Sequence, residues 1–99
     1  MALTHWGFIY TAPGLTPEGH WSSVTTGSCR TELVGVTSVQ HAPEAARRLT
    51  DQGVQLIELC GAFGPVSTAE VIEAIDGRVP VGAVAYGPEA ITPLHEIFS

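Results

Sequence analysis

The fold is decided by the segment Gly53-Val54-Gln55-Leu56-Ile57-Glu58-Leu59-Cys60-Gly61-Ala62-Phe63-Gly64-Pro65. It begins with a short, almost continuous run of apolar side chains, which is typical of a strand buried on both faces in a parallel sheet. A glycine turn follows the run. We therefore predict a strand that carries Glu58 and Cys60 near its carboxyl end, where open parallel sheets bind their ligands.

Glu58 is the unexpected residue of this strand. Burying a carboxylate costs several kcal/mol unless the group is paired, hydrogen-bonded or protonated. Apolar surroundings make a carboxylate hold its proton more tightly, which suits a general base that works near neutral pH. We expect Glu58 to be catalytic. The alternatives are that it faces water at a sheet edge, or that backbone donors or an arginine hold it.

Cys60 is the residue directly after the predicted strand. It is expected to line the same pocket or, as a second possibility, to act as a nucleophile. Its alternative is a small buried side chain of the core, which is the usual place for a free cysteine.

The rest of the chain predicts the elements around this strand. The expected strands are residues 5–11, 31–37, 54–59 and 79–85, and the expected helices are 41–52 and 67–76, with a last helical turn at 92–98. Gly53 is expected to end the first helix, and a capping box at Ser67 to begin the second. Residues 15–30 are predicted as a long connection with a short helical turn at 16–21.

This order of elements predicts one α/β domain over residues 1–99. The domain is expected to be a single small layer of four mostly parallel strands with two main helices, either flavodoxin-like or half of a barrel. So few elements leave one face or edge of the sheet uncovered. Pairing with a second copy would cover it, so we expect a homo-oligomer, with a dimer favoured.

Three predicted strands end in a similar way, with an aromatic residue followed by a glycine and proline turn. The ends are Tyr10 before Pro13-Gly14, Phe63 before Gly64-Pro65, and Tyr86 before Gly87-Pro88. Because the carboxyl ends of parallel strands meet at one edge of a sheet, these residues are expected to surround a mouth shared with Glu58 and Cys60. The alternative is that this sequence pattern merely ends strands.

Further residues supply polar contacts to the predicted mouth. Gly61 and Gly64 precede the second helix and could present backbone N–H groups to an anion. Tyr86, Tyr10 or His20 would donate a hydrogen bond to a developing oxyanion. Arg30 offers its guanidinium to a carboxylate ligand, or pairs with Glu32 or Glu58.

The charged residues exclude several classes of function. The net charge is -6, from ten acidic residues against four arginines and no lysine. Four scattered cations cannot form a surface for nucleic acid. The absence of lysine excludes covalent attachment of pyridoxal phosphate. The histidines show neither an i, i+4 pair nor zinc-site spacing to a cysteine, so we predict no metal and no cofactor.

Hydropathy and cysteine content set the expected location. No apolar run approaches the length of about 20 residues that spans a bilayer, so no membrane partner is expected. The chain starts without a leader pattern and has two cysteines, Cys29 and Cys60. We therefore expect free thiols in a reducing cytoplasm.

Over nearly its whole length the chain resembles a set of small bacterial proteins of about this size, a family of unknown function. The motifs are F-I-Y-T-A-P-G at Phe8–Gly14, G-V-Q-L-I-E-L-C-G-x-F-G-P at Gly53–Pro65, and a valine-rich strand ending Y-G-P-E-A at Val81–Ala90. This resemblance implies no activity.

A shorter likeness covers Gly53–Pro65 alone. This segment is similar to a strand of tryptophan synthase α-subunits and related phosphate-binding barrels, where an aliphatic-Glu-Leu-Gly sequence places a catalytic carboxylate at the barrel mouth. Glu58 has the matching place, but the chain lacks the rest of that barrel, including its phosphate loops. The likeness implies a general base and no particular substrate.

These features predict a small enzyme of the isomerase, lyase or cyclase type. Glu58 would be the general base that removes a proton next to the carbonyl of a small molecule. The alternative is a non-catalytic, oligomeric protein that binds a small ligand or assists a partner, with a structural Glu58. A concave pocket shared by Glu58, Tyr10, Phe63 and Tyr86 favours the enzyme, whereas a sealed pair with an arginine favours the alternative.

Overall fold

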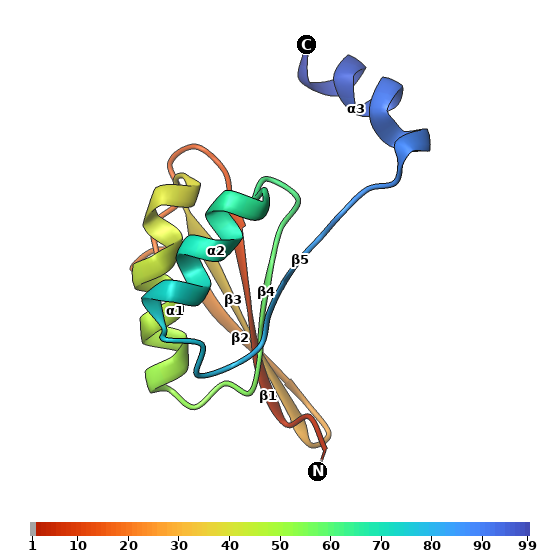
Figure 1. The fold of residues 1–99 in the computed structure, drawn as a ribbon. Helices are drawn as coiled ribbons and strands as arrows, with labels where there is room; N and C mark the ends of the chain where they lie inside the picture. Colours follow the sequence, from red (N-terminus) through yellow and green to blue (C-terminus); the bar gives the residue numbers. More distant parts are fainter. Residues whose placement is uncertain (1) are drawn as a thin grey trace.

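The computed structural model describes residues 2–99, which form a five-stranded sheet, two helices on one of its faces, and a third helix that stands apart (Figure 1). The strands are β1 His5–Thr11, β2 Trp21–Thr26, β3 Cys29–Val36, β4 Ile57–Leu59 and β5 Val81–Ala83. The helices are α1 Ala42–Asp51, α2 Pro65–Ala74 and α3 Ile91–Phe98, and short 3-10 helices are η1 Val39–His41 and η2 Pro88–Ala90.

The sheet has the strand order β2-β3-β1-β4-β5, in which only β2 runs antiparallel to its neighbour. The predicted mixed α/β architecture with a mostly parallel sheet is confirmed. The predicted number of four strands is wrong, because residues 21–26 of the expected loop form a strand. Their valine and threonines favour a strand. They show no inward and outward alternation, because this edge strand is exposed along most of its length.

Glycine and proline residues set the end of α1 and the start of α2. Gly53 follows α1 with a φ of +91°, which is the left-handed conformation expected of a residue that ends a helix. The second helix begins at Pro65, with Gly64 as N-cap, and no side chain caps it. The capping box expected at Ser67 therefore does not form. Proline at the first helical position already has the required φ, so the helix starts two residues earlier.

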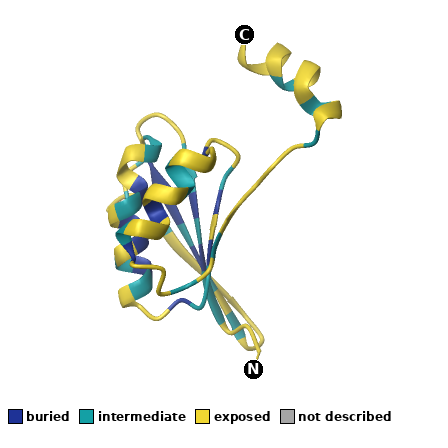
Figure 2. Ribbon diagram, in the orientation of Figure 1, coloured by how far each residue is buried: buried dark blue, intermediate teal, exposed yellow. Residues whose placement is uncertain are grey.

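The core lies between the sheet and the two packed helices. It is built from branched and small apolar side chains that are almost fully buried (Figure 2). The largest apolar side chains that are fully buried are Ile9, Val34, Val36, Leu49, Ile57, Leu59, Val71 and Ile75, and Phe63 joins them at 4% exposure. Gly7 lets α1 approach β1 closely, because a Cβ atom added there would lie 2.7 Å from Cδ1 of Leu49.

The opposite face of the sheet has no helix over it, and we call it the open face. In β4, Ile57 and Leu59 are buried while Glu58 between them is exposed. The prediction that this strand is buried on both faces is therefore wrong, and so is the expectation that Glu58 is buried. On the same face, Phe8 and Tyr10 of β1 stack with their ring centroids 6.1 Å apart.

Helix α3 extends beyond the carboxyl edge of the sheet and packs extensively only against η2 (Figure 1). Its residues are mostly exposed (Figure 2). Within residues 2–99, no helix has both the length and the apolar character needed to cross a membrane.

The contact between Gly7 and α1 gives a test of the fold. We expect Gly7→Ala to lower the free energy of unfolding by about 1–3 kcal/mol, because the new methyl group overlaps the fully buried Leu49. Gly82→Ala is the matched control in β5, where an added Cβ meets nothing within 4 Å. Urea denaturation followed by circular dichroism measures both variants. Equal stability of the two would contradict the packing described.

Candidate functional site

A cavity of about 450 Å³ lies at the carboxyl ends of β1 and β4, under α3, and we call it the carboxyl-end pocket. Its walls come from four separate parts of the chain. The lining residues are Thr11, Cys60, Gly61, Ala62, Tyr86, Leu94 and Phe98. None of these side chains is charged, so the pocket combines apolar walls with a few uncharged polar groups.

Hydrogen bonds hold the floor of this pocket in place. The Cys60 backbone N–H donates to the Ile9 carbonyl at 3.1 Å, which continues the ladder between β4 and β1. The Phe63 N–H donates to the Cys60 carbonyl at 3.1 Å and closes the glycine turn. These bonds bring the Cys60 Sγ to 3.9 Å from the Thr11 Oγ1.

The ring of Tyr86 lies against the backbone of Gly61. A Cβ atom at Gly61 would be 3.1 Å from the Tyr86 Cε2, so a larger residue would displace the ring. Tyr86 is 61% exposed, and its phenol therefore lies at the entrance of the pocket rather than in its floor.

Glu58 lies beside a separate, smaller hollow of about 160 Å³ on the open face, lined also by Gly82, Ala83 and Val84. The hollow exists because Gly82, the β5 residue paired with Glu58, has no side chain. Cys60 lies two positions after Glu58, and Tyr86 lies two positions after Val84. Each step covers about 7 Å of extended chain, so the hollow lies next to the carboxyl-end pocket.

The structure thus brings three of the predicted site residues, Cys60, Gly61 and Tyr86, to one pocket, and places Glu58 in the hollow next to it. Other predicted residues do not reach the pocket. Tyr10 stacks on Phe8 over the open face. Phe63 is 4% exposed and packs in the core. Gly64 is the N-cap of α2 and Gly87 the N-cap of η2.

His20 and Arg30 have local partners instead of a place at the pocket. The Nδ1 of His20 accepts a hydrogen bond of 3.0 Å from the Thr16 backbone N–H, and the residue is exposed. The guanidinium of Arg30 lies 2.6 Å from a Glu32 carboxylate oxygen. Of the two pairings left open for Arg30, the pairing with Glu32 is the one observed.

Glu32 is the buried carboxylate among residues 2–99, with a fully buried side chain on the helix-covered face of β3. The Trp21 indole N–H donates to it at 3.0 Å, the His5 Nε2 lies at 2.8 Å, and the Ser23 hydroxyl also donates. Sequence reasoning missed this residue. The available signal was its two-residue spacing to Val34 and Val36, which places all three on the same face of the strand.

The pKa of Glu32 is the result of two opposing effects. Burial raises it, but the hydrogen bonds from Ser23, Trp21 and His5 and the charge of Arg30 outweigh that effect and lower the pKa from 4.5 to about 2. Glu32 is therefore ionised at neutral pH and does not act as a general base. Its role is to join β1, β2 and β3 through their side chains.

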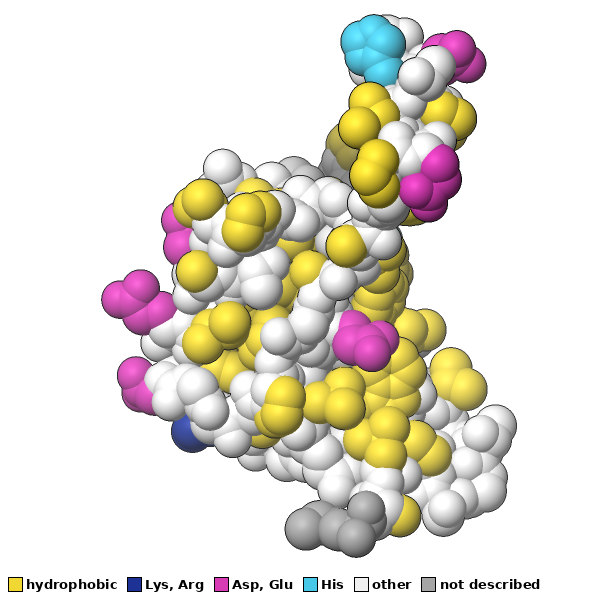
Figure 3. Space-filling model, turned by 45° about the vertical axis from the view of Figure 1, so that its right-hand side comes forward, with side chains coloured by type: hydrophobic (Ala, Val, Ile, Leu, Met, Phe, Trp, Pro, Cys, Tyr) yellow, Lys and Arg dark blue, Asp and Glu magenta, His cyan; other side chains and the backbone are white. Residues whose placement is uncertain are grey.

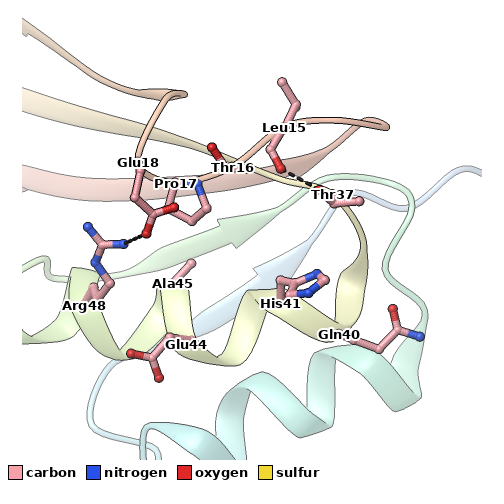
Figure 4. A pocket seen from close by; sticks show the side chains of 10 residues that line it. All are labelled: Leu15, Thr16, Pro17, Glu18, Thr37, Gln40, His41, Glu44, Ala45 and Arg48. Atoms are coloured by element: carbon pink, nitrogen blue, oxygen red, sulfur yellow. Dashed lines mark hydrogen bonds and ion pairs between the residues drawn. The ribbon is translucent and has the colours of Figure 1, made fainter.

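A further cavity of about 340 Å³ lies between residues 15–18 and α1 (Figure 4). Hydrogen bonds close both of its sides. Arg48 pairs with Glu18 at 3.4 Å and stacks 4.9 Å from the centre of the Trp21 ring. The Thr37 hydroxyl donates to the Leu15 carbonyl at 2.7 Å. Because its only lining arginine is already paired, this cavity offers less to a ligand than the carboxyl-end pocket does.

Comparison with known proteins assigns the chain to a family. A model described as "Family of unknown function (DUF6506)" matches residues 4–99. The chain belongs to this family. No curated protein and no solved structure matches it. The family match confirms the resemblance to small proteins of unknown function, whereas the likeness of Gly53–Pro65 to tryptophan synthase α-subunits finds no support in these comparisons.

The lowered pKa of Glu32 predicts a defined acid sensitivity. A carboxyl group whose pKa is depressed on folding stabilises the folded state above its unfolded pKa, and this stabilisation is lost as the pH falls from about 4.5 to about 2. Because Glu32 is fully buried, the effect is about 3 kcal/mol. We expect Glu32→Gln to lose stability of this order at pH 7, measured by urea denaturation.

Glu58→Gln is the matched control, since Glu58 is exposed and should change the stability by less than about 0.5 kcal/mol. The loss caused by Glu32→Gln should shrink when the same titrations are repeated between pH 4.5 and pH 2. A constant difference between parent and Glu32→Gln over this range would show that the Glu32 cluster does not hold an ionised carboxylate.

Proposed function

We propose that this protein binds a small, largely apolar molecule in the carboxyl-end pocket. The observation that carries the proposal is the convergence of Thr11, Cys60 and Tyr86, which follow or end three different strands, on one cavity of about 450 Å³. Small-molecule sites commonly have volumes of about 300–1,000 Å³, apolar walls and a few polar groups that orient the ligand. The Thr11 hydroxyl, the Cys60 thiol and the Tyr86 phenol are those groups here.

The lining residues favour an uncharged ligand. The wall has no cation to pair with a carboxylate or phosphate and no anion to pair with an amine. The net charge of -6 also repels anionic molecules. A neutral molecule with a carbonyl or hydroxyl group fits these walls, because the Tyr86 phenol can donate a hydrogen bond to either.

Ligand-observed NMR with small neutral ketones and alcohols, both aliphatic and aromatic, tests this function. We expect binding by members of this set and a loss of roughly tenfold in affinity for Tyr86→Ala, since the ring and its hydroxyl contribute of the order of 1.4 kcal/mol. Gln40→Ala, in the wall of the cavity beside α1, is the control and should bind as the parent does. Binding that is absent, or that Tyr86→Ala leaves unchanged, would count against this pocket.

A second candidate function is catalysis of the isomerase, lyase or cyclase type with Glu58 as general base. The observation that favours it is the hollow beside Glu58, adjacent to the pocket that holds Cys60 and Tyr86. A ketone seated in the pocket would extend its α-carbon toward the carboxylate. Glu58 would take the proton from that carbon, and the Tyr86 phenol would stabilise the oxygen of the resulting enolate.

Exchange of the α-protons of a bound ketone for deuterium tests this second function. In D₂O the enolate takes back a deuteron, so the parent should exchange faster than buffer alone. Glu58→Gln should slow the exchange by about 100-fold or more and retain binding. Gly82→Val should slow it as well, because the valine fills the hollow without meeting any atom within 4 Å of its Cβ. Exchange at the parent rate in both variants would exclude Glu58 as the base.

The cytoplasm remains the proposed location. Both cysteines, Cys29 and Cys60, are free thiols, as a reducing compartment favours.

A further inference from the structure

Helix α3 carries an apolar stripe that the rest of its own chain leaves exposed. The stripe consists of Ile91, Leu94, Ile97 and Phe98, whose spacing puts them on one side of a helix. Ile91, Ile97 and Phe98 are 66%, 70% and 82% exposed. An isolated helix of this length is not stable in water, because short helices need tertiary packing. The stripe therefore requires a surface to pack against.

The open face of the sheet is a second apolar surface without cover. Its central strand presents Trp6, Phe8 and Tyr10. The edge strand β2 adds Val24, and Val84 follows the other edge strand, β5; these two side chains are 50% and 45% exposed. Figure 3 shows hydrophobic side chains gathered over the body below α3 and along the helix itself. Sheets with mostly parallel strands normally bury both faces.

The helix does not lie over the open face of its own chain (Figure 1). The Val84 N–H donates to the Leu59 carbonyl at 2.9 Å, which extends the pairing of β5 with β4 by one residue. The chain therefore leaves the sheet along the strand direction, and α3 starts beyond its carboxyl edge (Figure 1). Leu94 and Phe98 line the pocket at that edge, while Ile91 and Ile97 are not among its walls.

We propose that two copies of this chain pair through their open faces, with α3 of each copy lying against the sheet of the other. The exchange is reciprocal, so the two copies are related by a two-fold axis. The dimer then covers four apolar surfaces, namely the open face and the α3 stripe of each copy. The five strands contain 27 residues and give the open face roughly 430 Å² in projection, from a strand spacing of about 4.8 Å and a rise of about 3.3 Å per residue. With the exposed side chains of α3, the pairing buries on the order of 800 Å² per copy, which is the size of a standard stable interface.

The distribution of charge favours this face over the others. Each copy has a net charge of -6, so two copies repel each other wherever acids are dense. The acids gather on the helix side, at Glu44, Asp51, Glu70, Glu73 and Asp76, in or next to α1 and α2. On the open face, Glu58 is the acid contributed by the strands. Glu89 of η2 and Glu96 of α3 are the acids nearest the proposed contact, and the helical period places Glu96 on the side of α3 opposite the stripe. The open face is therefore less acidic than the face that α1 and α2 cover.

Pairing would also complete the site, and this step rests on the function proposed above. As the single chain stands, Glu58 and its hollow are open to water. The partner's α3 would cover the open face beside them, which excludes water and leaves the space over Gly82 for a ligand. Each site would then consist of one copy's strands, Leu94 and Phe98 of its own α3, and a roof over the hollow from the partner's helix.

Sedimentation equilibrium without any ligand tests the pairing. The parent should have twice the chain mass of 10.4 kDa at micromolar concentrations. Ile97→Asp should raise the dissociation constant at least tenfold, because it places a charge in the interface. Ile97 is 70% exposed and does not line the pocket, so this variant should keep the parent's circular dichroism spectrum.

Val66→Asp is the matched control, with the same chemical change at a side chain of α2 that is 72% exposed. It should pair as the parent does, and a mixed sample of isotope-labelled and unlabelled copies should give NOEs between α3 of one copy and Phe8 or Tyr10 of the other. A monomeric parent, or a dimer that Ile97→Asp leaves as stable as Val66→Asp does, would overturn the proposal.

Because this experiment contains no ligand, its result is separate from that of the binding test. A dimer that binds none of the small ketones or alcohols would count against the proposed function alone. A monomer that binds them would count against the pairing alone.

Discussion

Two helices cover one face of a five-stranded sheet, and this unequal cover determines the properties of both faces. On the covered face, the buried side chains of β1, β3 and β4 are apolar except for Glu32, which is hydrogen-bonded. On the open face the same strands present aromatic side chains and Glu58, which a second layer would bury. The core is thus complete with α1 and α2, while the open face, the hollow beside Glu58 and α3 are the parts of the molecule that remain available for binding.

The local sequence predicts much of the part of the fold in which α1 and α2 cover the sheet. The aromatic and branched side chains of residues 5–11 and the glycine at position 53 predict β1 and the end of α1 as they are observed. The run from Val54 to Leu59 does not reveal which of its residues face a helix, because a continuous apolar run fits one covered face as well as two. Whether Glu58 is buried depends on what packs on the open face, and no local pattern contains that information.

In the candidate site, too, some residues could be predicted from the local sequence and others could not. Cys60, Gly61 and Tyr86 could be predicted, since each lies next to the carboxyl end of a strand and parallel strands end at one edge. Leu94 and Phe98 could not, because their place in the wall depends on the path of residues 84–90 after the sheet. The expected place of His20 at the mouth depends on the path of residues 15–30, and Arg30 had carboxylates of the chain as alternative partners; nearby partners in the fold determine where both side chains lie.

Glu32 and Glu58 are the two carboxylates on the strands that the structure describes. Their surroundings decide that Glu32 has a structural role and that Glu58 is free to contact a ligand. Glu32 receives donors from three strands, so its negative charge is fully satisfied and no capacity remains for a ligand. None of the ion pairs among residues 2–99 involves Glu58, and its neighbour across the sheet is a glycine. A carboxylate without a protein partner, beside a space that no side chain fills, is a stronger base when something covers it and excludes water. The apolar stripe of α3 is the surface of this chain that is suited to do so.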